Sequence, residues 1–426
     1  MQYPKLRNIE AFPIESEGQK AICLRDPAQI SSKIIAVPYD TFFVISLFDG
    51  KHSILDIQEA YTRQFGDLLF SNKINEIIKI LDENLFLDND NFNKHKQLLI
   101  EEFKQSPIRM SSHSGLSYPE NSKDLNEYIT GLFNLPDASG EPMNVGERRL
   151  TTVPDVKKKL SALIAPHIDF HRGGFCYTYS YKELAESELP DLFIILGVSH
   201  SDAKSLYIAT KKDFITPLGT AETDKDFVDE LVLRYKFDIF QDEFVHRNEH
   251  SIEFQVVFIQ YIMQKYHRCS RNIKIVPILC SSFQQFYIAN IQPTELPEVK
   301  DFVTAMKSII SERKQNICIV SGVDFSHIGR HFGDNFDLSP TIIQDTEKED
   351  KELLTFIEKR EKEKVFSSVQ KDLDKRKICG LPSIYALLAL LEGTNIKEGK
   401  LLKYAQAIDY QNQILVSFAS MIFVGA

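Results

Sequence analysis

The sequence ALIAPH at residues 162–167 indicates the fold class of most of the chain. It is a short apolar run that ends at a proline and is followed by His167. Similar runs occur in FIILGVSH at 193–200, in ICIVSGVDFSH at 317–327, and at 273–279. Between the runs lie amphipathic helical patterns at 224–235, 252–265 and 300–310. Almost wholly apolar strands that alternate with helices predict an α/β domain, with a mostly parallel sheet covered on both faces.

Polar side chains directly follow three of these predicted strands. His167 follows the first, His200 follows the second, and Asp324 and His327 follow the third. In open α/β sheets the carboxyl ends of the strands line the ligand crevice. Three histidines at equivalent positions therefore favour one shared site over three separate structural histidines.

Cys379 is a further candidate for this site. Pro382, three residues later, suits the first turn of a helix predicted over 383–391. A cysteine before a helix start lies near backbone N–H groups and the positive end of the dipole, which lowers its pKa and favours the thiolate, both nucleophile and metal ligand. Position alone allows equally a small buried thiol.

His246 and His250 are four residues apart, with Glu249 and Glu253 beside them. Two histidines at this spacing on a helix can bind a metal. Asn248, however, is predicted to cap the helix, which leaves His246 outside it. We therefore favour the interpretation that this segment caps the helix and forms hydrogen bonds to the residues that bind the metal.

Asp169 and His171 flank His167, and a glycine pair at 173–174 allows close approach of the backbone to a ligand. We expect His171 to lie next to the ligand residues or at the surface. We expect His331 to lie at the surface.

The composition excludes several classes of protein. The 426 residues carry a net charge of −10, which argues against a general nucleic-acid binder, since that needs clustered Lys and Arg. No run approaches the roughly 20 apolar residues that span a bilayer, and Met1–Ser16 is too polar for a signal peptide. Six scattered cysteines without CxxC spacing indicate a reduced, cytoplasmic chain that does not associate with membranes.

Residues 17–92 are predicted to form a separate small α+β domain. A helix is expected to start after Ser53 and to end at Gly66. The pattern around DGKHSILDI resembles the PqqD-like or winged-helix-like modules found beside peptide-modifying enzymes, and a generic small helical domain is the alternative. Residues 93–107 are interpreted as a charged helical linker. The charge-dense stretch 345–377 is interpreted as a solvated face with no active role.

From residue 108 onward, seven segments resemble the Memo family, also called AmmeMemoRadiSam system protein B, in order and spacing. They are Ser114–Pro119, Pro166–Phe170, Gly197–Ser201, Glu249–Glu253, Gly322–His327, Cys379–Ser383 and Leu402–Gln406. Two departures stand out. Ile168-Asp169 replaces Ala-Gly after the first histidine, which places a carboxylate near the expected metal, and Ser201 replaces the second histidine of a His-His pair.

The resemblance implies that residues 108–426 fold like the class III extradiol dioxygenases (LigB-like). It also implies a mononuclear metal site at His167, His200 and Cys379, with Asp324 and His327 as candidate catalytic residues of the pocket. The dioxygenases of that fold use a carboxylate where this chain has a cysteine, which argues against ring cleavage. Residues expected around these ligands are Asp169, His171, Glu249, His250 and Glu253.

Two imidazoles and a thiolate suit Fe(II) or Cu, and Zn is possible. Three protein ligands leave open positions, as a reactive site requires. The first hypothesis is therefore a metal-dependent oxidoreductase that acts with iron or copper and oxygen, with His327 as acid or base and Asp324 orienting it or binding substrate.

The same residues allow two other hypotheses about the function. In one, Cys379 acts without metal as the nucleophile of an acyl or amide transfer. In the other, the chain is a non-catalytic module of a peptide- or RNA-modification system, and its N-terminal domain recruits a partner such as a radical SAM enzyme or a modified peptide.

Overall fold

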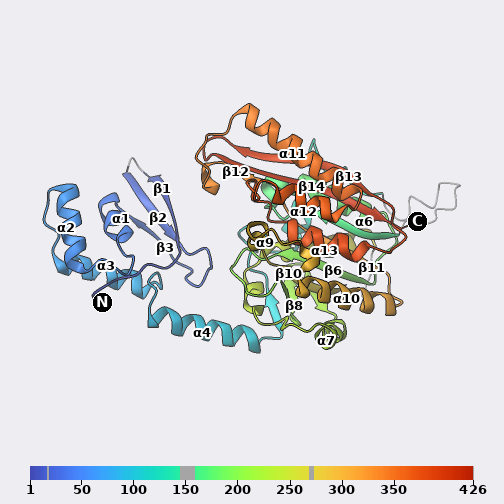
Figure 1. The fold of residues 1–426 in the computed structure, drawn as a ribbon, viewed down its shortest axis with the longest axis horizontal. Coiled ribbons are helices and arrows are strands. Elements are labelled where there is room, and N and C mark those ends of the chain that lie inside the picture. The colour runs from blue at the N-terminus through green and yellow to red at the C-terminus, as the bar shows by residue number, and fades with distance from the viewer. Residues whose placement is uncertain (17–18, 144–158, 268–272, 426) are drawn as a thin grey trace. The chain divides into compact units, whose positions relative to one another are not determined.

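The computed structural model describes residues 1–16, 19–143, 159–267 and 273–425, and the chain divides into two compact units, Met1–Gln105 and Ser106–Ala426 (Figure 1). The stretch 93–107, interpreted as a linker, falls mostly in helix α4 (Asp90–Gln105), which belongs to the first unit. Among the described residues no helix is long and apolar enough to cross a membrane.

The first unit combines a small antiparallel sheet with helices. The sheet order is β1-β2-β3. The elements before α4 are β1 (Glu10–Ser16), β2 (Gln19–Arg25), β3 (Ile34–Val37), α1 (Tyr39–Ser46), α2 (Ile54–Phe65) and α3 (Ser71–Glu83). The predicted ends of α2 are confirmed. The Ser53 side chain accepts a hydrogen bond from the Asp56 backbone in a capping box, and Gly66 ends the helix with a φ of 78°.

The second unit is built on one large sheet of mixed direction. Its order is β12-β14-β5-β11-β6-β10-β9-β8-β4, with β13 paired to β14 and β7 to β10. The central neighbours β5, β11, β6, β10 and β9 are parallel, whereas β14 pairs with β5 antiparallel.

The strands of this sheet are β4 (Ile108–Met110), β5 (Leu160–Ala165), β6 (Leu192–Val198), β7 (Tyr207–Ala209), β8 (Asp213–Thr216), β9 (Gly219–Thr223), β10 (Ile273–Cys280), β11 (Ile317–Gly322), β12 (His327–Ile328), β13 (Gly399–Asp409) and β14 (Ile414–Val424). The α-helices are α5 (Ser122–Phe133), α6 (Phe170–Ala185), α7 (Lys225–Arg234), α8 (His250–Tyr266), α9 (Gln284–Ala289), α10 (Pro297–Glu312), α11 (Pro340–Glu358), α12 (Lys362–Gln370) and α13 (Leu381–Leu391). Short 3₁₀ helices are η2 (Glu243–Arg247), η3 (Pro293–Glu295) and η4 (Arg330–Phe332).

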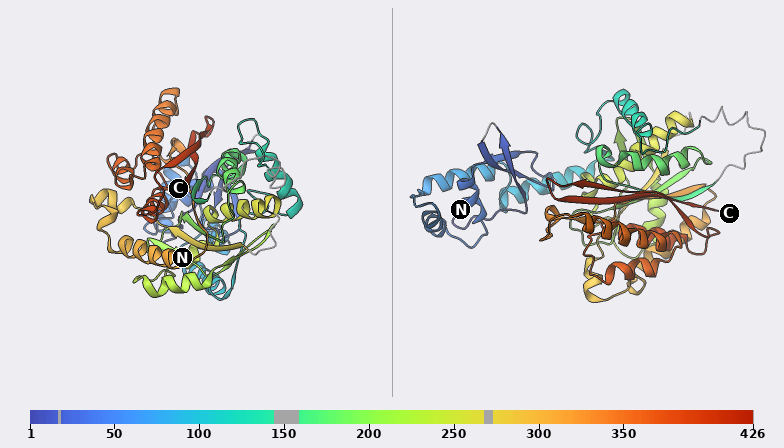
Figure 2. Two further views of the ribbon diagram at one scale, coloured as in Figure 1. Left: turned by 90° about the vertical axis from the view of Figure 1, so that its right-hand side faces the viewer. Right: turned by 90° about the horizontal axis from the view of Figure 1, so that it is seen from above.

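Alternate residues of each central strand enter different cores. Ile194 packs with the core that includes α7, α10, α12 and α13, whereas Ile195 packs with the core that includes α5, α6 and α8. Figure 2 shows helices on both faces of this sheet. The prediction of an α/β unit with a mostly parallel sheet covered on both faces is therefore confirmed. The long antiparallel hairpin of β13 and β14 extends the sheet beyond that prediction.

The interpretation of 345–377 as a solvated face was wrong in part. Leu353, Leu354 and Ile357 of α11 lie in the core, and Asp350 is fully buried. Charged residues surround these apolar positions in sequence, and α11 is amphipathic, so one side of the helix is buried although its composition is polar.

Candidate metal centre

Three histidines converge where the central parallel strands end. His167 and His200 each lie two residues beyond a strand, β5 and β6 respectively, and His250 is the first residue of α8. Their ligand atoms all lie within 4.8 Å of one another, the one such group that could hold a metal among the described residues. The strand ends thus bring His167 and His200 together, as their positions after the apolar runs suggest.

His167 is held in one orientation by the backbone around it. Its Nδ1 lies 3.0 Å from the Gly322 carbonyl oxygen, which can only accept, so Nδ1 donates the hydrogen bond. Its own backbone N–H donates to Asp324 Oδ1 at 3.0 Å. The residue is 2% exposed. Nε2 is therefore left as an acceptor, which is the form that a metal requires of an imidazole.

His200 is held in the same manner by a carboxylate. Its Nδ1 lies 3.1 Å from both carboxylate oxygens of Glu249, and its backbone N–H donates to the same side chain at 3.1 Å. A carboxylate behind an imidazole fixes the ring and makes the other nitrogen more basic, as is usual behind metal-bound histidines.

The pKa values of this pair move in opposite directions. Burial acts to lower the pKa of His200, but Glu249 and then Cys379 outweigh burial and raise it well above its usual value. Burial acts to raise the pKa of Glu249, but His200 and His250 outweigh it and lower it well below the usual range. For the two remaining rings, His167 and His250, burial lowers the pKa, so both are neutral near pH 7.

His250 lies in the cluster itself, a place not assigned to it from the sequence. The cap of α8 is Glu249, not Asn248 as predicted, because the Glu249 carboxylate accepts from the backbone N–H groups of His250 and Ser251. The His250 ring stacks on His200 with centroids 4.8 Å apart and an interplanar angle of 18°. His250 is therefore a candidate ligand. The signal in the sequence was a histidine directly after a capping glutamate.

Cys379 lies beside the cluster. Its Sγ is 3.4 Å from His167 Nε2 and 3.7 Å from the Asp324 carbonyl oxygen. The helix after it starts at Leu381. The expectation of a lowered thiol pKa was wrong for the protein without metal, since burial outweighs the contribution of His200 and raises the pKa. A bound cation would reverse this direction, because it stabilises the thiolate.

Asp324, which follows β11, contacts His167, and His327, the first residue of β12, interacts with His167 and His200 through its charge. Asp324 Oδ2 is 3.6 Å from His167 Nε2, and burial raises the pKa of Asp324 to about 6. His327 Nδ1 lies 3.1 Å from the Phe325 carbonyl oxygen and 3.2 Å from that of Lys377. Burial lowers the pKa of His327. Its Nδ1 therefore carries the proton and Nε2 is an acceptor.

A buried charge network fixes the segment that carries His327. Ser326, Ser417 and Arg376 all donate to the carboxylate of Asp350. The His327 backbone N–H donates to the Arg376 carbonyl oxygen at 2.7 Å. Asp350, from the stretch interpreted as a solvated face, thus helps to position a candidate catalytic residue.

A second buried network fixes the first turns of α8. Glu253 pairs with Arg109, and it also accepts from the backbone N–H groups of Ser112 and His113 at 3.0 Å each. Arg109 in turn donates to the Glu249 carbonyl oxygen at 2.7 Å. Glu253 therefore stabilises the turn at the start of α8, which carries Glu249 and His250.

Other polar residues singled out in the sequence lie outside the cluster. Asp169 caps α6 and pairs with Arg172, and His171 and His331 are exposed. His246 is buried in η2, with its Nε2 3.0 Å from the Ile208 carbonyl oxygen. The carboxylate that Asp169 adds is therefore used to cap a helix.

A cleft of about 240 Å³ opens beside the cluster. His200 and Cys379 line it together with Phe283, Tyr287 and Lys377. A ligand in this cleft would therefore touch the two side chains that also face the candidate metal.

The segment before Cys379, which forms one wall of this cleft, has unusual backbone angles. Leu373, Asp374 and Lys377 have φ of 55°, 56° and 54°, in the left-handed region that non-glycine residues rarely adopt. Lys377 Nζ is fixed by Asp334 at 2.6 Å. Such conformations cluster at functional sites, where the surrounding structure maintains them.

Comparisons with known proteins agree on one family. The sequence model described as Memo-like protein matches residues 109–422. A protein of Aquifex aeolicus named MEMO1 family protein is 31% identical over 423 residues, which are 99% of both chains.

Shorter archaeal relatives match a smaller part of the chain. MEMO1 family protein MK0963 of Methanopyrus kandleri is 25% identical over 320 residues, 74% of this chain and 98% of its own length. MEMO1 family protein PH1626 of Pyrococcus horikoshii is 26% identical over 322 residues, with the same shares. Each of these relatives thus matches about three-quarters of this chain over nearly its whole own length.

Proposed function

This chain belongs to the Memo family, and we propose that its second unit binds one iron or copper ion at the histidine cluster and uses it in an oxidoreductase reaction with oxygen. Zinc is the further metal that these donors suit. We also propose that this unit shares the LigB-like fold of the class III extradiol dioxygenases, with a cysteine at the place of their carboxylate ligand.

One observation supports the metal site above all others. In both His167 and His200 an oxygen acceptor holds the Nδ1 atom, which leaves Nε2 for a metal ion. His327 shares the Nδ1 arrangement but lies outside the group of ligand atoms, so it is the convergence of His167, His200 and His250 that supports a metal. The Cys379 thiol and the His250 imidazole add two donors at the same place. Nitrogen and sulfur donors together suit Fe, Cu and Zn, and not Mg or Ca.

The protein side chains have separate tasks in this proposal. When bound, iron or copper supplies one-electron chemistry with oxygen. His327 accepts or donates a proton at Nε2, since its Nδ1 is held by two carbonyl oxygens. Asp324 orients His167 through its backbone N–H. The cleft lined by His200 and Cys379 receives the substrate.

The metal-free alternative, with Cys379 as the nucleophile of an acyl or amide transfer, has weaker support. Nucleophilic cysteines need a low pKa, whereas burial raises that of Cys379. We retain a cytoplasmic location as part of the proposal, because a thiol ligand must stay reduced, and the described cysteines are free. A role as partner of a radical SAM enzyme remains a separate proposal for the first unit.

The test is metal analysis of the full chain purified without a polyhistidine tag. We expect about one iron or copper ion per chain. His200→Ala should remove it, whereas His331→Ala, a change of an exposed histidine on η4, should leave it bound. Cys379→Ser should abolish any thiolate-to-metal absorption band of the copper-loaded protein. A wild type that takes up no metal, or a His200→Ala variant that retains it in full, would refute the proposal.

A further inference from the structure

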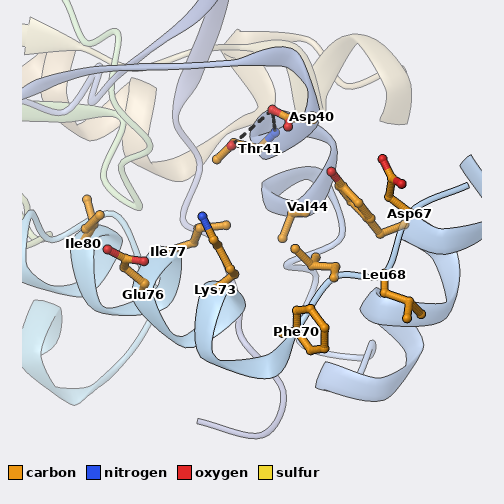
Figure 3. Close-up of a pocket in the computed structure, with 12 residues that line it drawn as sticks. Asp40, Thr41, Val44, Asp67, Leu68, Phe70, Lys73, Glu76, Ile77 and Ile80 are labelled. Carbon is orange, nitrogen blue, oxygen red and sulfur yellow. Dashed lines mark hydrogen bonds between the residues drawn. The ribbon is translucent and has the colours of Figure 1, made fainter. Parts of the chain in front are cut away.

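The first unit carries a groove unrelated to the metal centre. Figure 3 shows its lining residues, which come from α1, the segment after α2, and α3. The groove encloses about 430 Å³. The apolar lining comes from Val44, Tyr61, Leu68, Leu69, Phe70, Ile77 and Ile80. The groove lies outside residues 109–422, the part of the chain that the family model matches.

Two of its apolar side chains are largely exposed. Leu68 is 75% exposed and Phe70 is 67% exposed, both in the connection between α2 and α3. Exposed apolar side chains gathered around a concavity mark binding sites for other molecules, whereas single exposed ones are common.

The charged groups of the groove are unbalanced. Its lining includes three carboxylates, Asp40, Asp67 and Glu76, and one basic side chain, Lys73. Within the described part of the unit none of these four has an ion-pair partner, whereas Glu59 and Glu83 outside the groove pair with neighbouring cations. Three carboxylates against one ammonium leave the groove with an excess of negative charge.

From this combination we propose that the groove binds a partner polypeptide through a short segment that carries apolar side chains and Lys or Arg. The apolar side chains would fill the cavity against Leu68 and Phe70, and the cations would meet Asp40, Asp67 and Glu76. The carboxylates would repel nucleic acid and anionic lipid, so charge complementarity selects a basic peptide.

The experiment uses the full chain and dye-labelled peptides of about 12 residues, measured by fluorescence anisotropy. One amphipathic peptide combines Leu with Lys. A second has Glu at each Lys, and a third has Ser at each Leu. We expect saturable binding of the first peptide alone, weaker at higher salt because exposed charges are screened.

Groove variants have matched controls. The Leu68→Ser, Phe70→Ser double variant should bind about tenfold more weakly, whereas Leu55→Ser, at a position 76% exposed on α2 outside the groove, should bind as the wild type does. The Asp40→Asn, Asp67→Asn, Glu76→Gln variant should also lose about tenfold. Its control is Glu59→Gln, Glu83→Gln, Glu101→Gln, which removes the same charge elsewhere on the unit.

Circular dichroism verifies that each variant is folded. Absence of binding by the Leu/Lys peptide, or equal losses in groove and control variants, would overturn the proposal. Leu68-dependent binding to anionic vesicles without peptide binding would also overturn it and would identify a lipid-binding surface instead.

Discussion

The candidate metal centre of the second unit and the groove of the first unit differ in the burial of their charged groups. At the centre, Glu249 and Glu253 are buried and each has several partners from the same chain. At the groove, Asp40 and Glu76 are exposed and have no ion-pair partner among the described residues. Buried charges must be satisfied within the fold. Exposed charges can be left for another molecule, which agrees with the metal ion that we propose for the histidine cluster and the peptide that we propose for the groove.

The largest effect should follow from breaking the buried pair behind the centre. Glu253→Ala leaves the Arg109 charge buried without its partner and should lower the free energy of unfolding of the second unit by about 3–5 kcal/mol. Urea denaturation followed by circular dichroism measures it. Glu59→Ala breaks the exposed pair with Arg63 and should cost less than about 1 kcal/mol. Equal losses in the two variants would show that burial does not distinguish these pairs.

The next effect concerns pH and the buried His246. Burial lowers the pKa of this ring to about 4, from 6.5 when exposed. The unfolded chain therefore binds the proton between these values and the folded one does not, so stability is complete above pH 6.5 and falls as pH decreases toward 4. The loss should total about 3 kcal/mol.

This pH effect is measured by repeating the denaturation at several pH values. His246→Gln keeps a donor for the Ile208 carbonyl oxygen but does not titrate, so its stability should fall less over the same range. If the free energy of unfolding decreases equally with pH in the variant and the wild type, His246 is not the source of the pH dependence.

A smaller effect is expected from replacing Glu249, the carboxylate that hydrogen-bonds to His200. Glu249→Gln removes the charge that holds His200 and His250, and metal affinity should decrease about 10–100-fold. Isothermal titration with copper or iron measures it, and Glu59→Gln on the first unit is the control. Unchanged affinity would show that the histidines orient themselves without the carboxylate.

The smallest effect is expected at the groove. Leu68→Ser should change the free energy of unfolding by no more than about 0.5 kcal/mol, because the side chain is already in water. Phe86→Ala, at a fully buried position of the same unit, should cost about 3–5 kcal/mol. A large loss from Leu68→Ser would mean that Leu68 stabilises the unit, and would weaken its assignment to a binding surface.

Local patterns in the sequence were sufficient for the central strands, for the ends of α2 and for part of the site. Apolar runs predicted β5, β6, β10 and β11, and Ser53 and Gly66 predicted the ends of α2, because strand burial and helix capping depend on neighbouring residues. The positions of His167 and His200 followed from the rule that parallel strands end at one edge.

Other properties were decided by the tertiary structure alone. The place of His250 depends on Glu249 capping α8 while it also holds His200. The role of Asp350 depends on side chains far away in the sequence, such as Ser417. The direction of the Cys379 pKa depends on how much water the fold removes. In these three cases the burial and the long-range partners arise only in the assembled fold, because they depend on residues far apart in the sequence.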